Sequence, residues 1–429
     1  MKNLRVYFNQ NNSIHYIDSN RAKSVSNHKF NEMSKEHIYY ELQGHYTADL
    51  EGLITFFDEI QKTSIWLLKK FKIDLNDYRN INDFVLKYFL KFASKKLQKL
   101  KIPSIDYTEF KYQKNCYNSG LVSIEKNIIG KEIDCFGYDF TGFYVYLLGN
   151  STLQIPINKG IECKLAELNF PLKYGYYHVD ITNTQQYPNI YKVHNLSKNG
   201  TYTHYTLNFL KKNFPDITIT PKDNEYNAYI FMHLIDATDI FKKWYENYIK
   251  LKNYSKNSKI IKRLGSSLHG LLCEYYINQV SDDEVDDYDF SMITNDIYTP
   301  YKVLKRKFNS FILIKSDNPY KHNLARIKSF MTAYGRMLIG QFVIDSGLLN
   351  DCIRIYTDSI VLPYEFNFDN TEFKDYFKPE NKSSGKLTWK NAFYNNASWN
   401  TKQERHDDKK MEKENQKEID ELERQLNSL

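Results

Sequence analysis

The chain has 429 residues, enough for two or three domains with hydrophobic cores, and its 41% hydrophobic content is ordinary for a globular protein. No apolar run approaches the length of about eighteen residues that marks a membrane-spanning helix, and the N-terminal sequence lacks the apolar core of a signal peptide. We therefore expect no membrane partner and no secretion. The net charge of +7 permits a polyanionic partner without requiring one.

The composition is rich in Lys, Asn, Ile and above all Tyr, with 36 tyrosines and 16% aromatic residues. Two explanations stay open: the codon content of an AT-rich genome, or tyrosines that stack on bases beside lysines on phosphates. The five cysteines are odd in number, scattered, and not at metal-ligand spacing, so we expect a reducing interior without disulfides or structural zinc.

Apolar periodicity indicates an alternation of helices and strands. Residues 1–35 are polar and show little periodicity. The predicted helices cover residues 36–100, 237–251, 258–275 and 324–349, and the predicted strands cover residues 133–148, 175–182 and a hairpin at 302–315. Residues 281–290 are predicted to form a solvated acidic loop. The tail has four apolar residues at helical spacing, which is typical of a solvated single helix or of a short partner-binding helix.

Residues 354–362 are predicted to form a second hairpin, with Asp358 at its polar tip. One carboxylate does not hold a catalytic metal, and Asp139, which follows a β run, is the candidate partner. Two carboxylates from different strands can hold two divalent ions and support phosphoryl transfer. Lys262 and Arg263, on a predicted helix, can neutralise phosphate oxygens. Taken singly, the acid is also explained as a turn residue and the Lys-Arg pair as surface charge.

Five motifs in chain order resemble those of the protein-primed branch of family B DNA polymerases, found in phages, adenoviruses and linear plasmids, including mitochondrial ones. The first palm motif resembles Asp139-Phe-Thr-Gly-Phe-Tyr-Val145, and the second resembles Tyr356-Thr-Asp-Ser359. The fingers motif is similar to Lys262-x-x-x-Ser-Ser-Leu-His-Gly270. The template-contact motif is similar to Thr332-x-x-Gly-Arg336, and the linker before the palm is similar to Tyr117-Asn-Ser-Gly120. The resemblance covers residues 40–400.

The resemblance implies an α+β fold of right-hand type, with an antiparallel-sheet palm, helical fingers, a small thumb, and a helical remnant on the exonuclease side. The implied parts, in chain order, are the remnant (1–115), linker and first palm segment (116–149), an insertion like terminal-protein region 1 (150–235), fingers (236–275), an insertion like terminal-protein region 2 (276–322), palm (323–370), a thumb-like part (371–400) and the charged helical tail (401–429).

The resemblance also implies roles for individual residues. Asp139 and Asp358 are the expected catalytic metal ligands, with two Mg²⁺ ions as cofactor and Mn²⁺ as the alternative. The residues expected at the incoming nucleotide are Lys262, Ser266, His269 and Tyr144, the last packing under the sugar to exclude a 2′-hydroxyl. The residues expected at DNA are Tyr117, Gly120, Thr332, Gly335 and Arg336.

The sequence departs from the family pattern at several positions. Tyr356 stands where the family has the first acid of Asp-Thr-Asp-Ser, which lowers the local negative charge and predicts weaker metal binding. Ser266 and His269 replace the fingers Asn and Tyr. His269 is interpreted equally well as a stacking partner of the nascent pair and as an ordinary helix residue. Ala397 stands near the position of the family's primer-contacting lysine.

The N-terminal part differs most from the family. His45-Tyr-Thr-Ala-Asp49 weakly resembles the third exonuclease motif, and only about forty residues precede it, so we predict no 3′–5′ exonuclease activity in this chain. Either the missing part is a separate polypeptide, or the gene is truncated or decaying.

The leading hypothesis is therefore a DNA-directed DNA polymerase without proofreading. Its expected partners are primer-template DNA, deoxynucleoside triphosphates, a terminal protein and a separate exonuclease chain. The alternative is a polymerase-derived nucleic-acid-binding or structural protein that has lost catalysis. The mitochondrion and the host cytoplasm, for a virus or plasmid product, are both compatible locations.

Overall fold

The computed structural model describes residues 5–10, 13–18, 21–26, 39–41, 50–195, 197, 199–255, 258–281, 301–307, 310–315, 318–379 and 385–387. The exonuclease-like segment at 45–49, most of the acidic loop, the segment around Ala397 and the tail lie outside these residues. Among the described residues, no helix has both the length and the apolar character that a membrane span requires.

A six-stranded antiparallel sheet carries both predicted acids. Its order is β19-β6-β18-β17-β5, with β20 also pairing with β6. The strands are β5 (Val122–Ile124), β6 (Ile133–Phe140), β17 (Arg354–Tyr356), β18 (Ser359–Leu362), β19 (Phe377–Pro379) and β20 (Gly385–Leu387). The predicted hairpin at 354–362 is confirmed, since Tyr356 pairs with Ser359 and Arg354 with Val361.

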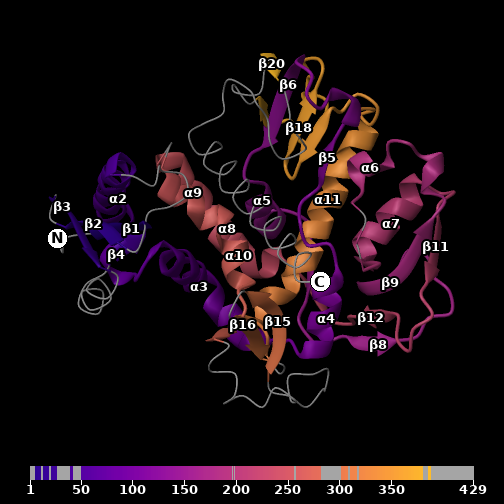
Figure 1. Cartoon of the computed structure of the whole chain (residues 1–429), viewed down its shortest axis with the longest axis horizontal. Coiled ribbons are helices and arrows are strands. Elements are labelled where there is room, and N and C mark those ends of the chain that lie inside the picture. Colours follow the sequence, from indigo (N-terminus) through magenta and orange to yellow (C-terminus); the bar gives the residue numbers. More distant parts are fainter. Residues whose placement is uncertain are drawn as a thin grey trace, which may run out of the picture.

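Helices pack around this sheet and beside it (Figure 1). They are α5 (Phe143–Gly149), α8 (Thr238–Ser255), α9 (Lys259–Ser266), α10 (Leu268–Leu272) and α11 (Ile327–Asp345). The core includes Phe140 on β6, Leu147 on α5, Trp244 on α8 and Leu264 on α9, all with fully buried side chains. The helices predicted at 237–251 and 324–349 are thereby confirmed, with shifted ends. The helix predicted at 258–275 is divided in two at Ser267.

Two further sheets lie in the segments expected as insertions. The first contains β8 (Ile161–Cys163), β9 (Gly175–Thr182), β10 (Thr201–Thr203), β11 (Thr218–Pro221) and β12 (Ala228–Ile230), with α6 (Ile190–Val193) and α7 (His204–Asn213) beside it. A short pair, β7 (Gln154–Pro156) and β13 (Leu234–Asp236), leads into and out of it. The second contains β14 (Ile277–Ser281), β15 (Tyr301–Lys307) and β16 (Ser310–Lys315). The strand predicted at 175–182 and the hairpin at 302–315 are confirmed.

The N-terminal part combines a sheet with three helices. The sheet has the order β3-β2-β1-β4 and contains β1 (Arg5–Gln10), β2 (Ser13–Asp18), β3 (Arg21–Ser26) and β4 (Tyr39–Glu41). The helices are α2 (Leu50–Phe71), α3 (Ile81–Leu100) and α4 (Tyr107–Asn115). The expectation of a mostly helical remnant is wrong for the described residues 5–10, 13–18, 21–26 and 39–41, which are strands. Short strands with alternating polar residues leave little apolar periodicity to detect.

Two other expectations need correction. The run predicted as strand at 133–148 is strand only to Phe140; Gly142 then adopts φ 72° and starts α5. The aromatic residues of 143–148 are good strand formers, and the burial of Phe143, Val145 and Leu147 alternates as in a strand. The helix therefore follows from the packing of this segment against α8 and α11 rather than from its local sequence. The segment expected as a thumb, 371–400, contributes β19 and β20 to the same sheet in its described part, rather than a separate unit.

A buried ion pair joins the N-terminal helices to the start of α11. Arg326 and Glu109 have side chains that are 1% and 2% exposed. Nη2 of Arg326 donates to Oε2 of Glu109 at 2.8 Å, and the guanidinium also donates to the carbonyl oxygens of Pro103 and Ser104. Because an unpaired buried charge costs several kcal/mol, this pair ties residues 103–109 to α11.

Gly265 controls how closely α9 approaches its neighbours. A Cβ built there lies 2.5 Å from Cγ2 of Val145 and 2.8 Å from Cζ of Tyr248. We predict that Gly265→Ala lowers the free energy of unfolding by about 1–3 kcal/mol, because both neighbours are buried and cannot give way freely. Urea denaturation followed by circular dichroism measures the change.

Gly270→Ala is the matched control, since no atom lies within 4 Å of its Cβ position. It should alter the unfolding free energy by less than about 1 kcal/mol, because alanine is the better helix former. Equal midpoints for the two variants would contradict the packing role of Gly265.

Candidate functional site

The structure brings Asp139 and Asp358 to the same end of one sheet. Asp139 is near the end of β6 and lies opposite Ser359 of β18. The backbone amide of Phe140 donates to the carbonyl oxygen of Asp358 at 2.8 Å, so the two acids lie on adjacent, hydrogen-bonded segments. Both are half-buried. Two acids more than two hundred positions apart in sequence thus lie on neighbouring segments of the backbone.

The loop predicted to precede the palm holds the hairpin tip in place. Thr357 has φ 60°, an uncommon conformation for a β-branched residue, and its amide donates to the carbonyl oxygen of Leu121 at 2.6 Å. A Cβ built at Gly120 would lie 2.4 Å from Oγ1 of Thr357, so only glycine permits this approach. The contact supports a strained turn next to Asp358.

Arg336 of α11 secures the other end of that loop. Its side chain is buried, its Nη1 donates to the carbonyl oxygen of Ser119, and its guanidinium lies 5.0 Å from the ring centre of Tyr117. Burial lowers the pKa of Arg336 to about 10, so the residue stays charged at neutral pH. Three predicted DNA-contact residues, Tyr117, Gly120 and Arg336, thereby form one assembly behind the acidic tip.

The other two predicted DNA-contact residues are turned toward the protein. Thr332 is buried, and its hydroxyl donates to the carbonyl oxygens of Lys328 and Ser329, each at 3.1 Å, within α11. A Cβ built at Gly335 would lie 2.9 Å from Cε1 of Phe143. These positions let α11 pack closely on α5; the predicted contact with template stays a prediction.

Tyr144 lies near Asp358 and against His269 of α10. Burial and then the charge of Asp358 raise its pKa to about 12, while Arg336 acts in the opposite direction. Its ring stacks with His269, with centroids 5.8 Å apart and planes at 9°. Burial and then Lys328 lower the pKa of His269 to about 4, so its imidazole is neutral at neutral pH. The pair forms a flat, uncharged aromatic surface beside the carboxylates.

Lys252 lies near Asp139 on the helical side, and Lys262 lies near Lys252. Lys262 and Ser266 are exposed on α9. Lys252 of α8 is half-buried, and its pKa is lowered by burial and then by Lys262, while Asp139 raises it. Its Nζ lies 3.8 Å from the Cβ position of Gly142, in the turn just after Asp139 and Phe140. Lys252 therefore lies where it interacts with both Asp139 and Lys262.

The sequence reasoning missed Lys252. Nothing in its local pattern separates it from the exposed lysines of the same amphipathic helix, and only the packing of α8 against α5 brings it near Asp139. Leu121 and Thr357 were missed for a similar reason, because their contact depends on how two distant loops meet.

A metal ion fits the donor set at the sheet end. Among the described residues, no group of three or more His, Cys, Asp and Glu side chains is gathered as for a closed metal site. Two carboxylates suffice for Mg²⁺, which keeps several waters and takes substrate phosphate oxygens as ligands. Asp139 and Asp358 are the residues that would hold it.

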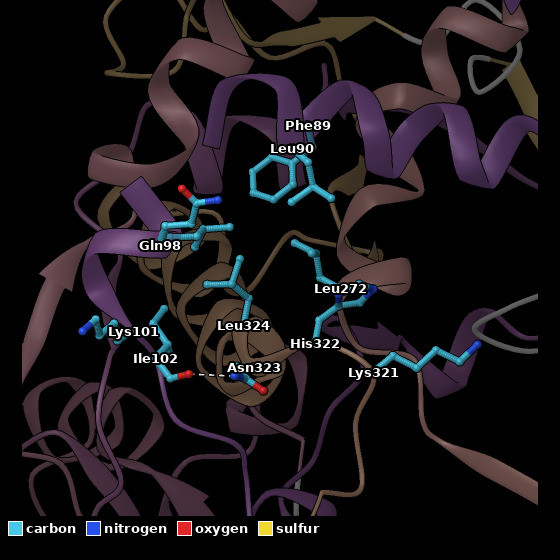
Figure 2. Close-up of a pocket in the computed structure, with 11 residues that line it drawn as sticks. Phe89, Leu90, Gln98, Lys101, Ile102, Leu272, Lys321, His322, Asn323 and Leu324 are labelled. Carbon is cyan, nitrogen blue, oxygen red and sulfur yellow. Dashed lines mark hydrogen bonds between the residues drawn. The ribbon is translucent and has the colours of Figure 1, made fainter. Parts of the chain in front are cut away.

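A separate cavity of about 440 Å³ lies between α3, the end of α10 and residues 321–324. Figure 2 shows apolar residues, among them Phe89, Leu272 and Leu324, around the space and Lys101 and Lys321 at its margin. None of the predicted site residues lines it.

Comparison with known proteins gives a likeness of fold. No protein-family model and no curated sequence matches the chain. Phi29 DNA polymerase complexed with primer-template DNA and incoming nucleotides matches with a TM-score of 0.51 and 14% identity, over 76% of this chain and 57% of that one. The same polymerase complexed with single-stranded DNA matches with a TM-score of 0.49 and 14% identity, over 80% and 57%. The chain spans a little over half the length of that polymerase, and its mixed helical and antiparallel-sheet fold resembles it.

We predict that Arg336→Met frees the loop at 117–121. The variant loses a charged hydrogen bond and a cation–π contact, together about 1–3 kcal/mol, so the loop should open more often. Limited proteolysis with mass spectrometry should then find faster cleavage within 117–121, by about tenfold for each 1.4 kcal/mol lost.

Arg79→Met, at an exposed arginine, is the control and should leave the cleavage rate unchanged. The same slow cleavage in both variants would show that Arg336 does not restrain the loop.

Proposed function

We propose that the protein is a DNA-directed DNA polymerase of the protein-primed type, acting without its own proofreading. The observation that carries the proposal is the placement of Asp139, at the end of β6, beside the turn that holds Asp358, with Lys252 interacting with Asp139 and Lys262. The likeness of fold to phi29 DNA polymerase supports it. The expected reaction joins a deoxynucleotide to a primer or terminal-protein hydroxyl and releases pyrophosphate.

We assign a role to each site residue from the charge of its side chain. Asp139 and Asp358 hold the divalent ions, which when bound neutralise phosphate charge and favour ionisation of the attacking hydroxyl. Lys262 and Lys252 bind the triphosphate and offset its charge as pyrophosphate leaves. The face formed by Tyr144 and His269 receives the sugar and base of the incoming nucleotide by packing rather than by charge.

One feature favours the alternative of a polymerase-derived protein without activity. The residue in the position of the family's first acid, Tyr356, is 39% exposed, and the Arg354 guanidinium lies 4.7 Å from its ring centre. The positive charge of Arg354 therefore lies near the position at which the family pattern has a carboxylate. This arrangement weakens divalent-ion binding, so we expect a higher ion requirement and better activity with Mn²⁺.

We predict that the purified protein extends a primer annealed to a template when Mg²⁺ or Mn²⁺ and the four deoxynucleotides are supplied. Asp358→Asn and Asp139→Asn should each lower the rate at least about a hundredfold, because each removes several kcal/mol of charge stabilisation. Gel-resolved extension of a labelled primer measures the rate.

Asp369→Asn is the matched control, since Asp369 is an exposed aspartate on the segment after the hairpin, and it should keep full activity. If the wild-type protein binds primer-template but extends it with neither ion, the alternative function replaces the polymerase.

We predict that Tyr144→Val raises the incorporation of ribonucleotides relative to deoxynucleotides by about tenfold or more, because removing the ring opens space at the sugar and one hydroxyl contact is worth about 1–3 kcal/mol. Competition between the two nucleotide types in single-nucleotide extension measures the ratio. Tyr144→Phe keeps the ring and should keep the selectivity. An unchanged ratio in the valine variant would remove the gating role.

A further inference from the structure

A row of four lysines runs along α3, far in sequence from the acidic tip. Lys87, Lys91, Lys95 and Lys99 follow one another at intervals of four residues, and all four are exposed. An α-helix rises about 1.5 Å per residue, so neighbouring lysines are about 6 Å apart along the axis and the row is about 18 Å long. We call these four residues the α3 lysine row.

The α3 lysine row carries charge that the protein itself leaves largely unopposed. Residues 81–101 contain six lysines and one aspartate, a surplus of five against a net charge of +7 for the whole chain. Lys87 forms an ion pair with Asp83 at 2.9 Å. For Lys91, Lys95 and Lys99, the described part of the chain offers no salt-bridge partner.

Like charges four residues apart destabilise a helix by about 0.2–0.5 kcal/mol per pair. Three such pairs in succession therefore work against α3, whose stability comes from its buried face. An external polyanion would convert this repulsion into attraction. A bound polyanion would therefore stabilise α3, as expected for a surface that binds a partner.

The surroundings of the row favour nucleic acid over a membrane. None of the exposed large hydrophobic side chains of the described residues lies on α3, and interfacial helices need such side chains to enter a bilayer. Aromatic rings do accompany the lysines: Nζ of Lys87 lies 5.8 Å from the ring centre of half-buried Tyr78, and half-buried Phe92 meets Tyr88 edge to face. Lysines with partly accessible aromatic rings are typical of single-strand binding.

The row also leads to an open space. Leu97, Gln98 and Lys101, at the C-terminal end of α3, line the cavity of about 440 Å³ shown in Figure 2. A straight row of cations suits a flexible single strand, which can follow it, better than a duplex, whose strands curve away around the helix axis.

We propose that the α3 lysine row binds the phosphate backbone of single-stranded nucleic acid. The partner is recognised through its phosphates and without regard to sequence. The row is separate from the site of Asp139 and Asp358, and the inference does not depend on the proposed polymerase activity.

The test measures how binding depends on salt. Each phosphate neutralised on a single strand contributes about −0.7 to the slope of log affinity against log salt concentration. The triple variant Lys91→Gln, Lys95→Gln, Lys99→Gln should therefore have a slope smaller by about 2 than the wild type. Fluorescence anisotropy of a labelled oligothymidylate, between about 50 and 200 mM NaCl, gives both slopes.

Two further variants separate this site from general charge. Lys126→Gln, Lys131→Gln, Lys173→Gln removes the same charge from exposed lysines elsewhere and should keep the wild-type slope. Replacing the three α3 lysines by arginine should also keep it. Circular dichroism verifies that each variant is folded, as expected because glutamine and arginine are good helix formers.

Equal slopes for the α3 triple variant and the control triple variant would overturn the proposal. A change of slope with a labelled duplex but none with the single strand would assign the row to duplex DNA and overturn it as well. Because the readout is binding, a failure of primer extension leaves this result independent.

Discussion

The antiparallel pairing of β6 with β18 is the constraint on which the candidate site depends. It fixes Ser359 opposite Asp139 and joins Phe140 to Asp358 by a backbone hydrogen bond. Because side chains alternate between the faces of a strand, a slip of one residue in this register would turn Asp139 to the opposite face of the sheet. The close approach of Gly120 to Thr357 adds a second restraint on the same turn. The paired strands therefore fix the backbone positions of the two acids. The irregular loop that contains Gly120 holds the turn between β17 and β18.

Around this point, burial changes what the neighbouring groups can do. Lys252 is made a weaker base by burial and by Lys262, yet Asp139 opposes that change. His269 is neutral, and Tyr144 stays protonated well above neutral pH. The result is a site in which Lys252 and Lys262 come from helices, the carboxylates come from the sheet and its turn, and an uncharged aromatic pair lies near Asp358. Such a separation suits a ligand that is itself divided into a charged and an aromatic part.

Much of this arrangement could be predicted from the sequence, and the failures have physical causes. The hairpin with Asp358 was predictable because it is local: two apolar runs flank a polar turn. The partnership with Asp139 was predicted because this acid follows a β run and because of the order of motifs; no local pattern encodes which strands pair. The strand predicted through residue 148 ended at Phe140, because a left-handed glycine and burial against α8 override strand propensity. The N-terminal strands escaped detection because their short alternating pattern resembles loop sequence. Lys252 could not be predicted as a site residue, because its local sequence does not distinguish it from the exposed lysines of the same helix.

The buried pair of Arg326 and Glu109 has a consequence for how the protein is made. The two residues are 217 positions apart. A ribosome that adds about 5–20 residues per second would reach the arginine roughly 10–40 s after the glutamate. During that interval, the carboxylate that will later be sealed inside the protein has to stay hydrated, so α4 cannot reach its final place. Docking of α4 against the start of α11 therefore waits until Arg326, about three quarters of the way along the chain, has been made, and this ion pair forms late in synthesis.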